Sequence, residues 1–130
     1  MFEAWTIREE VVAQQDEALR MSVRLLTDTK RAEYYRIFRS KYKDPDTYSV
    51  LNWICLTGLH HYYLGKYVRD TFNLVLLFVA VGLVLGEPLA GISLIIFIFL
   101  AEIPALFRGQ IIVANHNIST GNSIKAKLLD

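Results

Sequence analysis

Two long apolar blocks, separated by only a few residues, dominate the second half of this 130-residue chain. The first reads TFNLVLLFVAVGLVLG (71–86), and the second reads LAGISLIIFIFLAEIPALF (89–107). Because a helix rises about 1.5 Å per residue, the second block alone reaches roughly 30 Å, the thickness of a bilayer's hydrocarbon layer. The rest of the chain is too short to cover both blocks in a water-soluble core. The sequence therefore predicts an all-α integral membrane protein with a transmembrane helical hairpin, its spans at about 68–86 and 88–107.

The turn between the blocks and the positions of the basic residues predict how this hairpin is oriented. Gly86 is suited to end the first helix, Glu87 to face the positive start of the second, and Pro88 to occupy its first turn. Lysines and arginines precede the first span and follow the second, but the turn has none. Since basic residues are enriched on the cytoplasmic side, we expect both termini to be cytoplasmic and the short turn near Glu87 to be extracytoplasmic.

The segment 47–65, just before the hairpin, is uncharged when its histidines are neutral, but it contains several polar side chains. If it crossed the membrane, Lys66 and Arg69 would lie outside, against the charge bias. We therefore expect a re-entrant or interfacial segment, with a third span as the alternative, and Gly65 is suited to turn the chain into the first span. Aromatic residues typical of a membrane interface flank the segment: Tyr48, Trp53, Tyr62, Tyr63 and Tyr67.

Residues 1–46 are polar and rich in helix-forming side chains, which predicts a cytosolic amphipathic helical region. Thr27, Asp28 or Thr29 is suited to cap a second helix, at about 30–43, which is strongly basic. The first helix carries one apolar stripe, interrupted by Gln14, which predicts packing on a neighbouring helix or on a second copy. The stripe consists of Ile7, Val11, Ala18, Met21 and Leu25.

The basic helix combines aromatic and cationic side chains directly before the membrane segments. We expect four of its basic residues to contact anionic lipid head groups: Arg36, Arg39, Lys41 and Lys43. A basic, aromatic helix is also typical of nucleic-acid binding, but the preceding helix is acidic and the basic residues adjoin the membrane blocks. The sequence therefore predicts membrane lipids, and no nucleic acid, as partners.

Two further features concern packing. Gly82 and Gly86 form a small-x-x-x-small pair, which predicts close helix contact within the hairpin or with another copy. Residues 108–130 are expected to form a cytosolic polar tail that is flexible or is ordered by a neighbouring chain.

Glu102 is the only charged residue of the second apolar block and lies about one and a half turns from its cytoplasmic end. A carboxylate at that depth must be protonated, paired or close to water. The candidate partners near the same membrane face are His60, His61, Lys66 and Arg69. We expect one histidine to reach Glu102 and to pin the segment 47–65 to the hairpin.

Metal binding and catalysis are both disfavoured. Adjacent positions on a helix diverge by about 100°, so only one of His60 and His61 is expected to face a given site. Ser49, Cys55 and Thr57 have no evident base beside them, and the sequence has no glycine-rich phosphate loop. The sequence therefore predicts no metal, no cofactor and no enzymatic activity.

Residues 58–65, GLHHYYLG, followed by the apolar blocks, resemble the Gly-x-His-Arg-Phe-Tyr-Leu-Gly signature of the TM2 domain family. The run AEIPALFRGQIIVANHN is similar to the family's terminal pattern of an acidic residue, an apolar run, an arginine and an asparagine. The resemblance covers about 48–117. The chain departs from the pattern where His61 replaces arginine, Tyr62 replaces phenylalanine, Leu56 replaces glycine and Glu102 replaces aspartate. The resemblance implies a small helical membrane domain attached to variable soluble regions, with no enzymatic activity.

Two functions are compatible with these features. The first is a non-enzymatic membrane scaffold, anchor or assembly subunit that acts through lateral helix packing and a cytosolic helix, as a homo-oligomer or within a larger membrane complex. The alternative is an oligomeric proton- or ion-conducting or sensing element that uses Glu102 with His60 and His61. We favour the first, because Glu102 is the only acidic residue inside the two apolar blocks and polar groups do not line a whole helix face.

Overall fold

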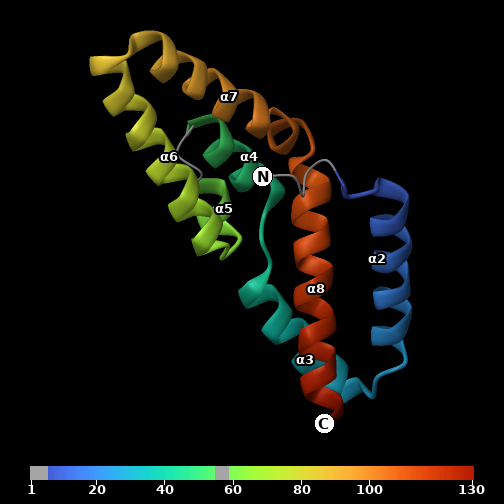
Figure 1. The fold of residues 1–130 in the computed structure, drawn as a ribbon. Helices are drawn as coiled ribbons and strands as arrows, with labels where there is room; N and C mark the ends of the chain where they lie inside the picture. Colours follow the sequence, from blue (N-terminus) through green and yellow to red (C-terminus); the bar gives the residue numbers. More distant parts are fainter. Residues whose placement is uncertain (1–5, 55–58) are drawn as a thin grey trace. The chain divides into compact units, whose positions relative to one another are not determined.

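The computed structural model describes residues 6–54 and 59–130, and its regular structure in this part of the chain is entirely helical (Figure 1). The all-α class predicted from the sequence is therefore confirmed for these residues. The helices are α2 (Glu9–Arg24), α3 (Asp28–Lys41), α4 (Pro45–Ile54), α5 (Leu59–Tyr63), α6 (Tyr67–Gly86), α7 (Pro88–Phe107) and α8 (Gly109–Leu129).

The chain divides into two compact units. The first contains Asp46–Gly109 together with Thr6, and we call it the apolar unit. The second contains Ile7–Pro45 and Gln110–Asp130, and we call it the polar unit. This division differs from the three consecutive regions expected from the sequence, because the C-terminal residues belong to the same unit as the N-terminal helices.

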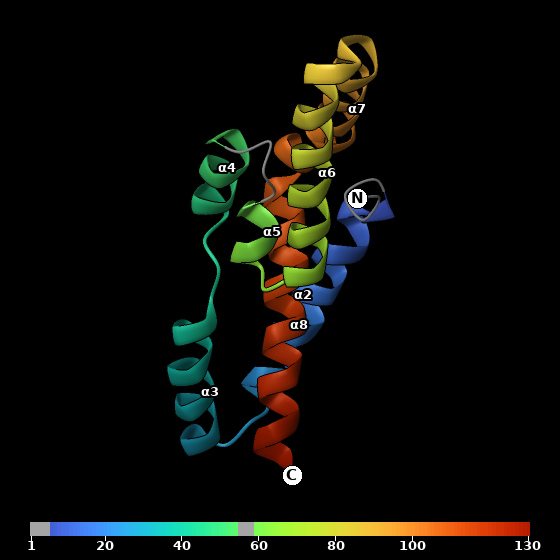
Figure 2. The ribbon, with the colours of Figure 1, turned by 60° about the vertical axis from the view of Figure 1, so that its left-hand side comes forward.

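Helices α6 and α7 form the main part of the apolar unit and pack against each other (Figures 1 and 2). Their bounds agree within one residue with the expected spans. Residues at nearly equal distances from Glu87 meet across the pair: Gly91 lies close to Val84, and Asn73 bonds Glu102. The two helices therefore run antiparallel.

The closest approach of α6 and α7 depends on Gly91. A Cβ atom at Gly91 would lie 2.5 Å from the backbone nitrogen of Val84 and 2.8 Å from the carbonyl oxygen of Ala80. A Cβ atom at Gly82 or Gly86 would meet no described atom within 4 Å. Of the two alternatives for the Gly82 and Gly86 pair, contact inside the hairpin is not observed, and contact with another copy stays a prediction.

The outward faces of α6 and α7 carry large, exposed apolar side chains. Pro88–Phe107 is the one helix in the described part of the chain that is long and apolar enough to cross a membrane, and α6 contains a shorter apolar stretch, Thr71–Gly86. The exposed residues include Phe72, Val75, Phe78, Val81 and Leu85 on α6, and Leu89, Ile92, Ile96, Phe97, Phe99 and Leu100 on α7.

The segment 47–65 contains two short helices, α4 and α5, and residues 55–58 between them lie outside the described part. α4 has 10 residues and α5 has 5, or about 15 Å and 8 Å, so neither helix alone matches the hydrocarbon thickness. Gly65 has a φ of 74°, a left-handed conformation that favours glycine, and its amide donates to the carbonyl of Tyr62 at 2.9 Å. The predicted turn at Gly65 is confirmed, and α5 packs on α6.

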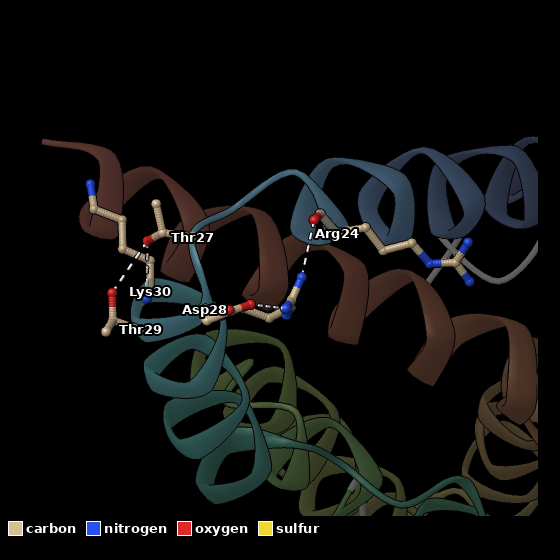
Figure 3. A network of polar contacts seen from close by, with 6 residues as sticks. Arg24, Thr27, Asp28, Thr29 and Lys30 are labelled. Carbon is tan, nitrogen blue, oxygen red and sulfur yellow. Dashed lines mark hydrogen bonds and ion pairs between the residues drawn. The ribbon is translucent and has the colours of Figure 1, made fainter.

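The polar unit is built from α2, α3 and α8 around an apolar core. The core residues are Val12, Leu19, Val23, Tyr34, Ile118 and Ile124. α3 begins where the sequence indicated, because the Thr27 hydroxyl oxygen accepts a hydrogen bond from the Lys30 amide at 3.5 Å (Figure 3). In the same turn, the Arg31 side chain donates to the Arg24 carbonyl oxygen at 3.2 Å and pairs with Asp28. These contacts hold the connection between α2 and α3.

Most of the apolar stripe predicted for α2 does not face the core of the polar unit. Val11 and Leu25 are 39% and 88% exposed, and Ala18 and Met21 are also exposed, whereas Ile7 packs partly against the core. The buried residues of α2 recur at helical spacing on a rotated face, and two of the three lie one position after a stripe residue, which is a rotation of about 100°. They are Val12, Leu19 and Val23. The helical period was therefore correctly predicted, but the face that packs inside the polar unit was not, and packing of the exposed stripe on a second copy stays a prediction.

Residues 109–129 form helix α8 instead of a flexible tail, and the helix is ordered by its own chain. A Cβ atom at Gly121 would lie 2.6 Å from the Tyr34 hydroxyl of α3 and 2.7 Å from a Leu19 methyl carbon of α2. Helix α8 therefore packs closely on both α2 and α3. The buried Asn117 side chain accepts a bond from the Lys43 amide at 3.0 Å and donates to the Lys43 carbonyl at 2.9 Å. α8 is thus part of the core of the polar unit.

Candidate functional site

Buried polar side chains from three helices of the apolar unit meet at one place, and we call them the His–Glu cluster: His60, His61, Asn73 and Glu102. α5 supplies both histidines, α6 supplies Asn73 and α7 supplies Glu102. The fractional exposures are 0% for His60, 5% for His61, 1% for Asn73 and 8% for Glu102. The cluster therefore lies in the interior, where polar groups need partners.

The carboxylate of Glu102 is the centre of this cluster. Its Oε1 atom accepts a hydrogen bond of 2.8 Å from the Asn73 side-chain amide. Its Oε2 atom lies 3.2 Å from Nε2 of His60 and 3.5 Å from Nε2 of His61. Each carboxylate oxygen thus faces a different helix, and the contacts connect α5, α6 and α7.

The predicted contact between a histidine and Glu102 is found, but the expectation that only one ring would face the site is wrong. The two ring centroids are 4.0 Å apart, and both Nε2 atoms point to the same oxygen. The 100° separation applies to the Cα–Cβ directions. Long, rotatable imidazole side chains can converge on an acceptor placed between those directions, as they do here.

Asn73 belongs to the cluster although the sequence reasoning missed it. It is the only amide in the first apolar block, and it lies 14 residues before Glu87, whereas Glu102 lies 15 residues after it. In an antiparallel helix pair these positions come to the same depth. A polar residue at the same distance from the turn as a charged one was the available signal.

Lys66 and Arg69 were also expected near Glu102. Lys66 is the residue before α6 and is half-buried, and the described contacts of Glu102 come from the other members of the cluster. The side chain of Arg69 lies outside the described residues, so its place near Glu102 stays a prediction. The cluster that the structure describes is made of imidazole, amide and carboxylate groups.

Tyr48 of α4 lies against the cluster. It is fully buried, and its ring meets that of His60 edge to face with centroids 5.3 Å apart. Tyr62 and Tyr67 are more than half exposed and contact each other at a centroid distance of 5.0 Å, as interfacial aromatic residues would. Nδ1 of His60 has no hydrogen-bond partner among the described residues, so the network around this ring is incompletely satisfied.

The basic residues expected at lipid head groups lie on or just after α3, and two of them already have partners within the polar unit. The Arg36 guanidinium donates to Glu33 at 3.1 Å, and the Lys43 backbone bonds Asn117. Arg39 and Lys41 are exposed. The aromatic residues of α3 divide as well, because Tyr34 is buried and stacks on Phe38, whereas Tyr35 and Tyr42 are exposed.

Comparison with known proteins adds no assignment: no family model, no curated protein and no solved structure matches the chain. The resemblance to the TM2 domain family stays a prediction. The class that the fold and site define is an all-α chain with a paired set of apolar helices and a buried histidine–carboxylate cluster.

Proposed function

We propose that the chain is a non-enzymatic membrane anchor or assembly subunit, with α6 and α7 as a transmembrane hairpin. The observation that carries this proposal is the contrast between the two sides of the helix pair. Large apolar side chains cover its outward faces, and its buried polar groups gather on the side of α5. Apolar surface of this extent is unfavourable in water and favourable in lipid or against other apolar helices.

In this arrangement α4 and α5 form the re-entrant or interfacial segment, and both termini are cytoplasmic. The exposed Trp53, Tyr62 and Tyr67 suit the boundary between head groups and hydrocarbon. The anionic head groups would face the exposed Arg39 and Lys41. A membrane domain of this kind is also what the TM2 resemblance implies.

The His–Glu cluster would then hold the short helix α5 on the hairpin. Inside a membrane, polar groups must find partners within the protein, because lipid tails offer none. The contacts of Glu102 with Asn73 and with both histidines supply those partners across three helices. In this proposal the cluster has a structural role and needs no movement.

Lateral assembly is the second part of the proposal. Gly82 and Gly86 lie on the exposed surface of α6 with open space beside them, which lets another helix approach closely. We expect a second copy of the chain, or a helix of a larger membrane complex, to occupy this surface.

The test is the mass of the purified full-length chain in lipid nanodiscs, together with the identity of co-purifying proteins. We expect more than one copy per disc or a stable partner, and we expect the Gly82→Ile variant to lose that association. Leu85→Ile, on an exposed position of the same helix, is the matched control and should retain it. A monomer without any bound protein, or a chain released from membranes by an alkaline wash, would refute the proposal.

A second candidate function is proton or ion conduction or sensing by an oligomer. The direct contacts of His60 and His61 with Glu102 favour it, because such groups exchange protons readily. Liposome flux tests it: conduction requires a flux that the Glu102→Gln variant abolishes. A flux that is absent between about pH 5 and 8, where histidine titrates, or unchanged in that variant, would contradict it.

A further inference from the structure

We infer that His60, His61 and Glu102 form a binding site for a divalent late transition-metal ion, with Zn²⁺ as the best-matched ion. This inference goes beyond the anchoring function and does not depend on it, because the three side chains meet inside one chain. It also reverses the expectation from the sequence, which disfavoured a metal on the ground that one histidine would point away.

The donor set has the right chemistry. Two imidazole nitrogens and one carboxylate oxygen are ligands that Zn²⁺ and neighbouring transition metals prefer, and a third protein ligand is enough when water or a small anion takes the fourth position. With two neutral imidazoles and one carboxylate as ligands, the net charge of the site with a bound divalent ion is +1. The fourth ligand is therefore expected to be water, hydroxide or another small anion.

The donor atoms are also close enough together. All three lie within 4.8 Å of one another. Ligand bonds of about 2.0–2.1 Å in a tetrahedral site place ligand atoms about 3.3–3.5 Å apart. The distances from Glu102 Oε2 to Nε2 of His60 and of His61, 3.2 Å and 3.5 Å, already agree with that spacing. Small rotations of the side chains would complete the site.

Asn73 gives the carboxylate the orientation that a metal ligand needs. Its amide donates to Oε1 of Glu102 at 2.8 Å, which leaves Oε2 directed at both imidazole rings. Contacts of this kind, from an outer residue to a ligand, fix ligand geometry in metal sites. Asn73 is buried, so its amide is held in place by its surroundings.

The test uses the full-length chain in detergent micelles, stripped of metal with a chelator and then titrated with Zn²⁺ by calorimetry and with Co²⁺ by visible absorption. We expect one ion per chain and the intense Co²⁺ bands of a tetrahedral site. Glu102→Gln and His61→Gln should each weaken binding by more than about 100-fold, and Asn73→Ala by roughly 10–100-fold, the range for residues that orient a ligand.

His116→Gln is the matched control, because it removes a histidine of α8 in the polar unit and leaves the three ligands intact. It should bind as the unchanged chain does. Glu102→Gln keeps a side-chain oxygen for Asn73, and circular dichroism of the metal-free proteins separates loss of a ligand from loss of the fold. The inference is overturned if the unchanged chain gives no tetrahedral Co²⁺ bands, or if all variants bind Zn²⁺ equally. Either result leaves the nanodisc test of assembly unaffected.

Discussion

Substitution of glycine by alanine is expected to lower stability at Gly91 but not at Gly82, because only Gly91 lies in the close contact between α6 and α7. In Gly91→Ala, the new methyl carbon would lie 2.5 Å from the Val84 backbone nitrogen and 2.8 Å from the Ala80 carbonyl oxygen. Both neighbours are backbone atoms, which cannot rotate out of the way. The helices must therefore separate locally by about 1 Å to restore ordinary contact, since non-bonded heavy atoms pack at about 3.5–4.0 Å.

The expected loss of stability follows from overpacking at this position. Overpacking of a close contact typically destabilises by about 1–3 kcal/mol, and we expect Gly91→Ala to reach the upper part of that range because backbone must move. Gly82→Ala has the opposite sign. Its methyl group meets open space, and alanine favours a helix over glycine by about 0.5–1 kcal/mol. The two variants should differ by about 3 kcal/mol, or roughly 100-fold in the unfolding equilibrium constant.

The assay is reversible unfolding of the two variants in the same detergent micelle, followed by circular dichroism, with the unchanged chain as reference. We expect Gly91→Ala below the reference and Gly82→Ala at or above it. Equal stability of the two variants would show that α6 and α7 are not in contact at Gly91, and the antiparallel arrangement argued from that contact would have to be abandoned.

Three further predictions concern the polar unit. Asn117→Ala should lower the free energy of unfolding by about 1–3 kcal/mol, because it leaves two backbone groups without their partner, whereas Asn122→Ala at an exposed position of the same helix should change it little; equal effects would contradict the contact. Burial raises the pKa of Tyr34 above its ordinary value near 10. The contribution of protonated Tyr34 to the free energy of unfolding should therefore be fully present below about pH 10 and be lost as the pH rises through the folded-state pKa. A series of melting temperatures measured against pH should show this alkaline loss, and the Tyr34→Phe variant should not show it. Arg39→Gln should weaken flotation with anionic vesicles more than Arg36→Gln does, since Arg36 is already paired with Glu33. The reverse order would contradict the proposed contact between α3 and the membrane surface.

The features that the sequence predicted well are those set by neighbours along the chain. The length of the apolar blocks and the Gly-Glu-Pro turn placed α6 and α7 within one residue. The cap residues at 27–29 placed the start of α3 within a few residues, and the structure selects Thr27 among them. The need of a deep carboxylate for a partner correctly predicted that a histidine would reach Glu102. Each of these follows from local geometry or from the free energy of a single group.

The features that only the tertiary structure decided are those that depend on how helices are rotated and paired. A period of 3.6 residues gave the spacing of the apolar residues of α2, but burial of Val12 and exposure of Val11 depend on where α3 and α8 lie. The polar sequence of α8 concealed Ile118 and Ile124, which are buried because α2 and α3 supply the other side of the core. Convergence of both histidines on one oxygen likewise required the relative positions of α5 and α7. Sequence determined which groups needed burial or partners, and the packing of the helices determined which partners they found.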